Sequence, residues 1–145
     1  MTRTMEDART DLLSDDPEIQ GRGKRTVESL ATQGDALAIY AIATWYLHGS
    51  NGYELDLIKA RELLERSSQL LVPEAMYDLA VLLEKKDNSK NRKRKAFALY
   101  TIAAAMGDRD SLAQVERCFY WGIGTYRDRD VASIIAKQLA STQDK

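Results

Sequence analysis

The sequence predicts an all-α protein, a short right-handed α-solenoid of about three helix-pair repeats behind one or two N-terminal capping helices. Three observations predict this fold. Small and apolar residues recur with a period of 36 residues. Within each period they follow helical spacing, and glycine or aspartate stands where one helix should end and the next should begin. Helix pairs of this kind bury their apolar faces only by stacking on one another.

The composition narrows the class of protein. The chain has 145 residues, 44% hydrophobic and 30% charged, which is enough apolar material for one folded domain. Its formal net charge of -1 lacks the positive excess typical of a dedicated nucleic-acid binder. No apolar run is long enough to cross a membrane, and the first residues lack the apolar core of a signal peptide. We therefore expect a cytoplasmic protein without membrane insertion.

The first segment, residues 1–33, is expected to form an N-terminal cap and a degenerate half-repeat. Its apolar residues have no clear counterparts in the later repeats, which suggests one or two capping helices. The stretch from Glu6 to Glu18 is rich in aspartate.

Repeat 1 is expected over residues 34–72. Gly34 should end the preceding helix in the left-handed conformation, and Asp35 should cap the first helix of the repeat. Asp56 stands where the second helix should begin, and Ala60 marks the buried face of that helix.

Repeat 2 is expected over residues 73–106. Pro73 suits the first turn of its first helix, and Ala96 lies 36 residues after Ala60 in the second helix. This repeat is the irregular one, because Lys85–Lys90 stands in place of the glycines that separate the two helices of the other repeats and opens the basic segment Lys85–Lys95.

Repeat 3 and a C-terminal cap are expected over residues 107–145. Gly107 and Asp108 repeat the glycine–aspartate junction of repeat 1, Asp128 stands at the predicted start of the second helix, and Ala132 follows Ala96 by 36 residues.

The pattern resembles the Sel1-like repeat (SLR) family, a relative of the tetratricopeptide repeats. The family unit runs A-x-x-x-L-G-x-x-Y-x-x-G-x-G, followed by an acidic residue, by K-A and by a pair of small residues. Repeat 1 matches it at Ala38, Ile42, Ala43, Tyr46, Gly49, Asp56, Lys59, Ala60, Ser67 and Ser68. Repeat 3 matches it at Val115, Phe119, Gly122, Gly124, Asp128 and Ala132. The period of 36 favours this family over ordinary tetratricopeptide repeats, whose period is about 34.

Residues that could catalyse a reaction or hold a metal are few, so we expect neither an enzyme nor a cofactor. Cys118 and His48, the single cysteine and histidine, occupy non-equivalent positions of repeats 3 and 1, which favours packing over a catalytic dyad. One cysteine and one histidine also cannot form an ordinary structural zinc site. Asp108 and Asp128 each open an Asp-Arg-Asp sequence at a predicted helix start, where capping explains them better than metal binding.

Aromatic residues on the first helices and basic residues of repeat 2 are the candidate recognition residues. Tyr46 and Phe119 occupy core positions, whereas Trp45 and Trp121 fall outside the core columns near helix ends. Exposed tryptophan and tyrosine are typical binding anchors. The predicted partner-binding residues are Tyr40, Thr44, Trp45, His48, Tyr77, Val81, Arg92, Lys93, Arg94, Arg117 and Trp121.

The family resemblance implies a protein-binding module whose first helices line a concave face. Short bacterial members often look like adaptors, signalling regulators or immunity proteins, and we expect an immunity or antitoxin-like protein that binds and neutralises a cognate toxin. The alternative is an adaptor or regulator that binds nucleic acid or an anionic surface through Lys85–Lys95. Because the net charge is near zero, nucleic acid is the less expected partner.

Overall fold

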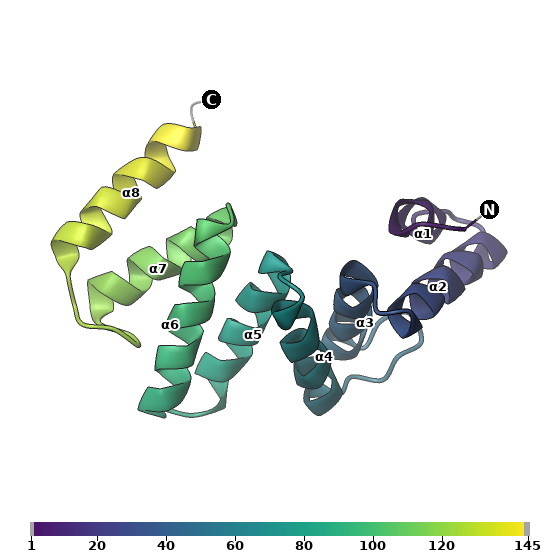
Figure 1. The fold of residues 1–145 in the computed structure, drawn as a ribbon, viewed down its shortest axis with the longest axis horizontal. Coiled ribbons are helices and arrows are strands. Elements are labelled where there is room, and N and C mark those ends of the chain that lie inside the picture. Colours follow the sequence, from purple (N-terminus) through teal and green to yellow (C-terminus); the bar gives the residue numbers. More distant parts are fainter. Residues whose placement is uncertain (1, 144–145) are drawn as a thin grey trace. The chain divides into compact units, whose positions relative to one another are not determined.

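The computed structural model describes residues 2–143, whose regular elements are all α-helices (Figure 1). The predicted all-α, helix-pair architecture is therefore confirmed. The helices fall into two compact units, Met1–Val72 and Pro73–Lys145. No helix in the described part of the chain combines the length and the apolar character needed to cross a membrane.

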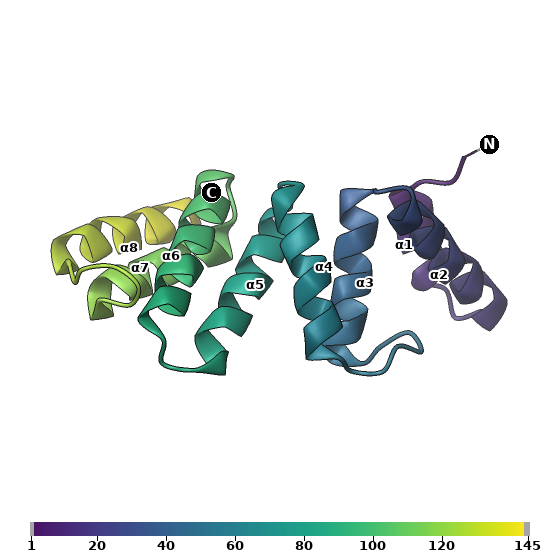
Figure 2. The same cartoon turned by 60° about the horizontal axis from the view of Figure 1, so that its bottom comes forward.

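Unit 1 contains two helix pairs. Its helices are α1 (Met5–Leu12), α2 (Pro17–Thr32), α3 (Ala36–His48) and α4 (Leu57–Gln69). Each helix packs on the next one along the chain, and Figure 2 shows α3 and α4 lying side by side.

Unit 2 also contains two helix pairs. Its helices are α5 (Pro73–Lys86), α6 (Lys90–Ala105), α7 (Arg109–Trp121) and α8 (Arg129–Gln143). Consecutive helices again pack on one another, and the loop between α7 and α8 runs back beside α6 (Figure 1).

The predicted helix starts are confirmed in their local chemistry. Asp35 accepts a hydrogen bond of 3.0 Å from the backbone N–H of Ala38, and Asp56 accepts bonds from the first turn of α4. Asp108 accepts a 3.0 Å bond from the N–H of Ser111 at the start of α7. Each carboxylate satisfies N–H groups that have no partner inside the helix.

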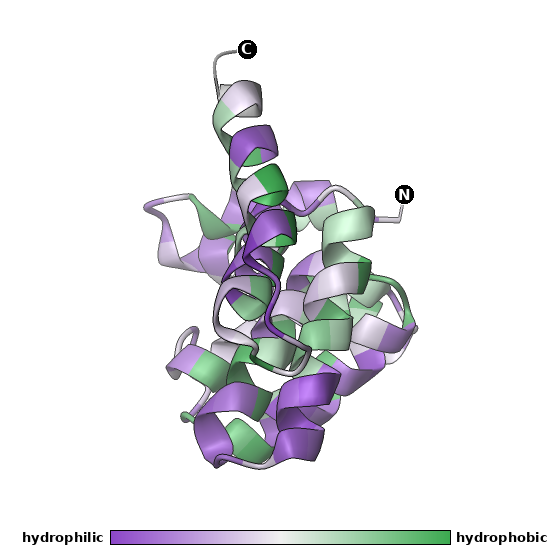
Figure 3. Cartoon of the chain, turned by 90° about the vertical axis from the view of Figure 1, so that its left-hand side faces the viewer, coloured by the Kyte–Doolittle hydropathy of each residue, from purple (hydrophilic) through white to green (hydrophobic). Residues whose placement is uncertain are grey.

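A column of small residues lies buried on the second helix of each pair. Ala60, Ala96 and Ala132 are buried on α4, α6 and α8, where the small side chain lets neighbouring helices approach closely. Hydrophobic and hydrophilic residues both occur along α8, as Figure 3 shows.

The N-terminal helices, whose sequence shows no clear repeat columns, also form a pair with a small residue on its second helix. Gly23 lies on α2, 37 residues before Ala60, and a Cβ atom there would lie 2.8 Å from the Asp11 Cβ atom. A side chain would therefore separate α1 from α2. Glycine at this position is the counterpart of the alanine column, a similarity hidden in the sequence by the shortness of α1.

The acidic N-terminal stretch also has a structural role. Asp7 forms a capping box with Thr4 at the start of α1, which lowers the pKa of Asp7. Asp16 caps α2 through the N–H of Glu18 at 2.9 Å. Asp11 lies buried between the guanidinium groups of Arg3 and Arg22.

Candidate functional site

In unit 1, three of the predicted partner-binding residues lie on successive turns of α3. Tyr40 and Thr44 are half-buried and His48, the last residue of the helix, is exposed. The Thr44 hydroxyl donates a 2.6 Å hydrogen bond to the carbonyl oxygen of Ala41, which fixes its rotamer. These residues form a line distinct from the buried side of α3, to which Ala43 belongs.

The expected exposure of Trp45 is wrong. This side chain is only 6% exposed and belongs to the core cluster of unit 1, with Ala8 and Val27 of the first helix pair. Its ring centroid lies 5.4 Å from that of Tyr53, in the loop after α3. The repeat columns describe packing within one helix pair, so they miss a tryptophan that packs on the preceding pair and on a loop.

The loop residue Tyr53 is a structural residue that the sequence reasoning missed. Its hydroxyl donates a 3.0 Å hydrogen bond to Glu28, and the ammonium of Lys24 lies 5.2 Å from its ring centroid. Burial, followed by the hydrogen bond to Glu28, raises the pKa of Tyr53 to about 12. An aromatic residue four places after the helix-ending Gly49 is the signal that could have identified it.

In unit 2, α5 holds Tyr77 and Val81 one turn apart, both half-buried. The ring of Tyr77 lies 5.7 Å from that of Tyr100 on α6, in an edge-on contact. Tyr100 is fully buried, and burial raises its pKa. One edge of Tyr77 is thus fixed by the core, while part of the side chain stays accessible.

Arg117 of α7 is fixed by an ion pair with Glu84 of α5. The Nη2 atom of Arg117 lies 2.7 Å from both carboxylate oxygens of Glu84, and its Nε atom lies 2.7 Å from the side-chain oxygen of Gln114. Burial disfavours the charge of Arg117, but Glu84 outweighs this effect and raises the pKa of the arginine. The guanidinium therefore keeps its charge in one defined orientation.

Trp121 is the large exposed aromatic residue of unit 2. Its side chain is 62% exposed at the end of α7, and its ring centroid lies 4.8 Å from that of Tyr120. Gly122, with a φ of 70°, ends the helix immediately after it. Trp121 thus lies outside the core as predicted, on the last turn of α7.

The basic residues lie in the first turns of α6. Arg92 pairs with Asp87 at 3.5 Å and is half-buried. Lys93 and Arg94 line a hollow of about 390 Å³ in unit 2, completed by Lys90, Gly122, Gly124, Thr125 and Tyr126. The structure thus brings the basic segment and the glycine loop of repeat 3 together, although they lie some thirty residues apart in the sequence.

The groups that could support catalysis have other roles. Cys118 is fully buried, and burial raises the pKa of its thiol to about 11, so the thiol is neutral at physiological pH. Asp128 accepts hydrogen bonds from the N–H groups of Asp130 and Val131 at the start of α8. Within residues 2–143, no group of three potential ligands from His, Cys, Asp and Glu could hold a metal ion.

A fold of successive helix pairs, with buried small residues and accessible first-helix side chains, defines a helical-repeat protein. The family model for the Sel1 repeat matches residues 36–70 and 73–108. The chain therefore belongs to the Sel1-like repeat family. Sel1 repeats are protein-interaction modules, and the family is generally a non-catalytic scaffold.

Two solved structures resemble the chain. A Sel1 repeat protein from Oxalobacter formigenes is 25% identical, with a TM-score of 0.68 over 80% of this chain and 86% of that one. A protective antigen present in uropathogenic Escherichia coli strains, which displays an SLR fold, is 20% identical, with a TM-score of 0.78 over 96% of this chain and 29% of that one. The second likeness shows the fold alone.

A curated relative comes from fission yeast. Chitin synthase regulatory factor 2 of Schizosaccharomyces pombe is 34% identical over 93 residues, which cover 59% of this chain and 18% of that protein. The chain thus spans less than a fifth of the length of this relative.

Proposed function

We propose that this chain binds a protein partner through the accessible side chains of its first helices and catalyses no reaction. Each unit has its own set of such side chains: Tyr40, Thr44 and His48 in unit 1, and Tyr77, Val81, Arg117 and Trp121 in unit 2. The observation that carries the proposal is the exposure of Trp121, since an accessible tryptophan on an interaction scaffold is typical of a binding hot spot.

The division into repeats is part of the same proposal. We take residues 1–33 as the N-terminal cap with a degenerate half-repeat, residues 34–72 and 73–106 as repeats 1 and 2, and residues 107–145 as repeat 3 with a C-terminal cap, all in one structural domain. On this division each repeat contributes its first helix to binding and its second helix to support.

For the partner, we propose a cognate toxin that the chain neutralises in the cytoplasm. The likeness to a Sel1 repeat protein from Oxalobacter formigenes supports a protein-binding role. The name of the fission yeast relative, a regulatory factor, supports control of another protein's activity.

The second candidate is an adaptor that contacts nucleic acid or an anionic surface through the basic segment Lys85–Lys95. The observation in its favour is that Lys90, Lys93 and Arg94 form no ion pair with a carboxylate in the described part of the chain.

A capture experiment tests the proposed function. The immobilised chain is exposed to a lysate of its source organism, in parallel with the variants Tyr77→Ala and Trp121→Ala and with the control Ile58→Ala, an exposed residue on the second helix α4. We expect a protein that wild type and control retain equally. Its binding to Trp121→Ala should be weaker by at least about 2 kcal/mol, or roughly thirtyfold. Equal retention by all variants would refute the proposed surface.

The toxin proposal has a separate test. The gene of the captured protein is expressed in a test host with and without the chain. Growth arrest that the chain relieves would support neutralisation, and a captured protein that leaves growth unaffected would refute it.

A further inference from the structure

The hollow in unit 2 carries a concentration of positive charge. Lys90, Lys93 and Arg94 line it from α6, and Tyr126 lines it from the loop before α8. In an α-helix, residues three and four positions apart lie on one face, so the three cations repel one another. Among the residues that the structure describes, no acidic one lines the hollow.

Some basic residues elsewhere in the chain are neutralised by a neighbouring carboxylate, unlike those of the hollow. Arg22 is paired with Asp11, Arg117 with Glu84, and Arg92, in the same turn of α6, with Asp87. Among the described residues, none forms an ion pair with Lys90, Lys93 or Arg94. An anionic ligand would relieve their mutual repulsion.

Two tyrosines at equivalent positions of the two units also indicate that the hollow is open to a ligand. Tyr53 and Tyr126 each lie four residues after the glycine that ends a first helix. In unit 1 the ring of Tyr53 is covered by Lys24 and its hydroxyl is bonded to Glu28.

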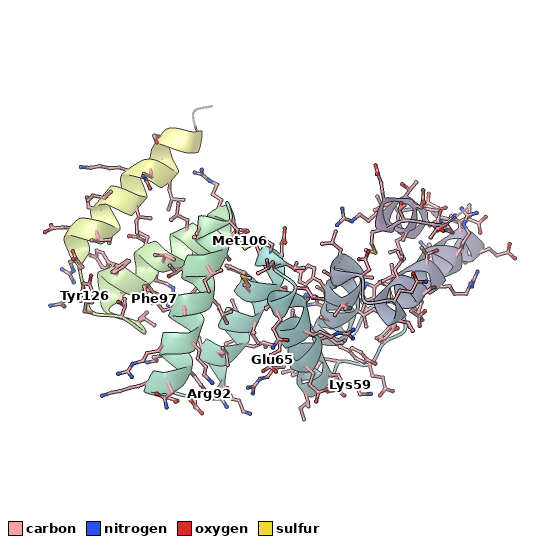
Figure 4. The ribbon with its side chains drawn as sticks, in the orientation of Figure 1. Lys59, Glu65, Arg92, Phe97, Met106 and Tyr126 are labelled. Atoms are coloured by element: carbon pink, nitrogen blue, oxygen red, sulfur yellow. The ribbon has the colours of Figure 1, made fainter. Side chains whose placement is uncertain are left out.

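Tyr126 lacks such a cover. It is 70% exposed, its hydroxyl forms no hydrogen bond in the described structure, and its ring centroid lies 5.9 Å from that of Phe119. The ring centroid of Phe119 in turn lies 5.4 Å from that of Phe97, so an aromatic row connects Tyr126 to α6; Figure 4 labels Phe97 and Tyr126. The tyrosine at this loop position is therefore covered in unit 1 and exposed in unit 2.

We propose that this hollow binds an acidic segment of a protein partner, with carboxylates beside Lys90, Lys93 and Arg94 and an apolar side chain against Tyr126. The inference rests on the proposed function in taking the partner to be a protein. A volume of about 390 Å³ accommodates a few side chains.

The lining of the hollow favours a protein segment over single-stranded nucleic acid. Proteins that bind single strands stack successive bases on several aromatic rings, whereas Tyr126 is the one ring that lines this hollow among the described residues.

Direct titration tests the inference. A fluorescently labelled poly-glutamate peptide capped by tyrosine is titrated with the full chain at low ionic strength and followed by anisotropy. Parallel titrations use a labelled single-stranded DNA of equal charge and vesicles containing phosphatidylserine. We expect saturable binding of the peptide that weakens with added salt, because the contacts are electrostatic.

Variants localise the binding. The charge reversal Lys90→Glu, Lys93→Glu and Arg94→Glu should weaken peptide binding at least about tenfold, and Tyr126→Ala should weaken it several-fold. The control reverses three exposed cations elsewhere, Arg25→Glu, Arg66→Glu and Lys137→Glu, so that it has the same net charge, and should change binding less than about twofold. If the reversed variant loses helicity by circular dichroism, the neutral set Lys90→Gln, Lys93→Gln and Arg94→Gln replaces it.

The outcomes separate this inference from the proposed function. No saturable peptide binding, or equal losses in the hollow variants and the control, overturns the inference. Tighter binding of the DNA or the vesicles with the same dependence on Lys93 and Arg94 overturns it in favour of an anionic ligand that is not a protein. Capture of a partner through Tyr77 and Trp121 is measured independently, so either result can fail alone.

Discussion

At Gly124, the backbone of one loop meets the backbone of a helix. A Cβ atom there would collide with the carbonyl group of Lys93 and would lie 2.9 Å from the Cβ atom of Phe97. The residue also has a φ of 70°, in the left-handed region that disfavours side chains. Gly107 has a φ of 99° but open space around it, so a side chain there would meet the backbone strain and no steric collision.

These two glycines give a matched prediction. Gly124→Ala should lower the free energy of unfolding by about 3 kcal/mol or more, because either the loop or α6 must shift. Gly107→Ala should cost only about 1 kcal/mol, the strain of the backbone conformation. Urea unfolding followed by circular dichroism measures both values, and equal losses would show that the loop does not pack tightly on α6.

The pairing of Asp11 with Arg22 predicts that the free energy of unfolding depends on pH. The hydrogen bonds from Arg22, at 2.8 and 2.9 Å, are the main cause of the lowered pKa of this buried carboxyl. A carboxyl whose pKa is lower in the folded state stabilises the fold above its ordinary pKa of 3.8, and this stabilisation is lost as the pH falls through the folded-state pKa. Acidification should therefore weaken the packing of α1 on α2.

The variant Asp11→Asn isolates this effect. Between about pH 6 and about pH 3, wild type should lose more unfolding free energy than Asp11→Asn, and the two proteins should converge at lower pH. Asp15→Asn, a change at an exposed aspartate, serves as the control and should follow wild type. Parallel pH profiles of wild type and Asp11→Asn in urea unfolding would contradict the role of Asp11.

At the level of the helix, α3 and α7 place their tryptophans in opposite environments. Trp45 lies in the core of unit 1, whereas Trp121 is exposed at the end of α7. Trp45→Ala should lower the unfolding free energy by about 3–5 kcal/mol, the cost typical of a large cavity. Trp121→Ala should change it by less than about 0.5 kcal/mol.

Fluorescence provides a second measurement of the same contrast. The chain has only two tryptophans, so each variant reports on the other. Trp121→Ala should leave a blue-shifted emission that acrylamide quenches weakly, and Trp45→Ala a red-shifted emission that it quenches strongly. Similar quenching of the two variants would contradict the assigned environments.

The contrast between these helices also shows which features can be predicted from the sequence. The caps at Asp35, Asp56 and Asp108 were predictable because a cap depends on residues within one turn of the helix. The burial of Trp45 was not, because it depends on Tyr53 and on a preceding helix pair without recognisable repeat columns.

The candidate binding residues likewise divide into those that the sequence predicts and those that depend on contacts between distant segments. The positions of Tyr77 and Trp121 on first helices follow from the repeat register. The ion pair of Arg117 with Glu84, 33 residues away, does not, since neither residue belongs to a repeat column. Likewise, the basic segment was visible in the sequence, but its juxtaposition with Tyr126 arises from a loop that folds back on α6.

For the whole molecule, our proposals divide the described residues into a scaffold and a recognition set. The buried alanines, the capping aspartates and the loop glycines stabilise the helix pairs, whereas the accessible first-helix side chains and the basic hollow form the proposed recognition set. Because the net charge is near neutral, this proposal makes partner choice depend on these local groups and not on a general electrostatic attraction.

The most direct test of this division is hydroxyl-radical footprinting of the chain alone and in complex with its captured partner. Our account predicts that oxidation of Tyr77 and Trp121 slows several-fold in the complex, while that of Leu13, an exposed residue outside the proposed surface, stays unchanged. Unchanged oxidation of Tyr77 and Trp121 in a saturated complex would contradict the claim that the first helices form the binding surface.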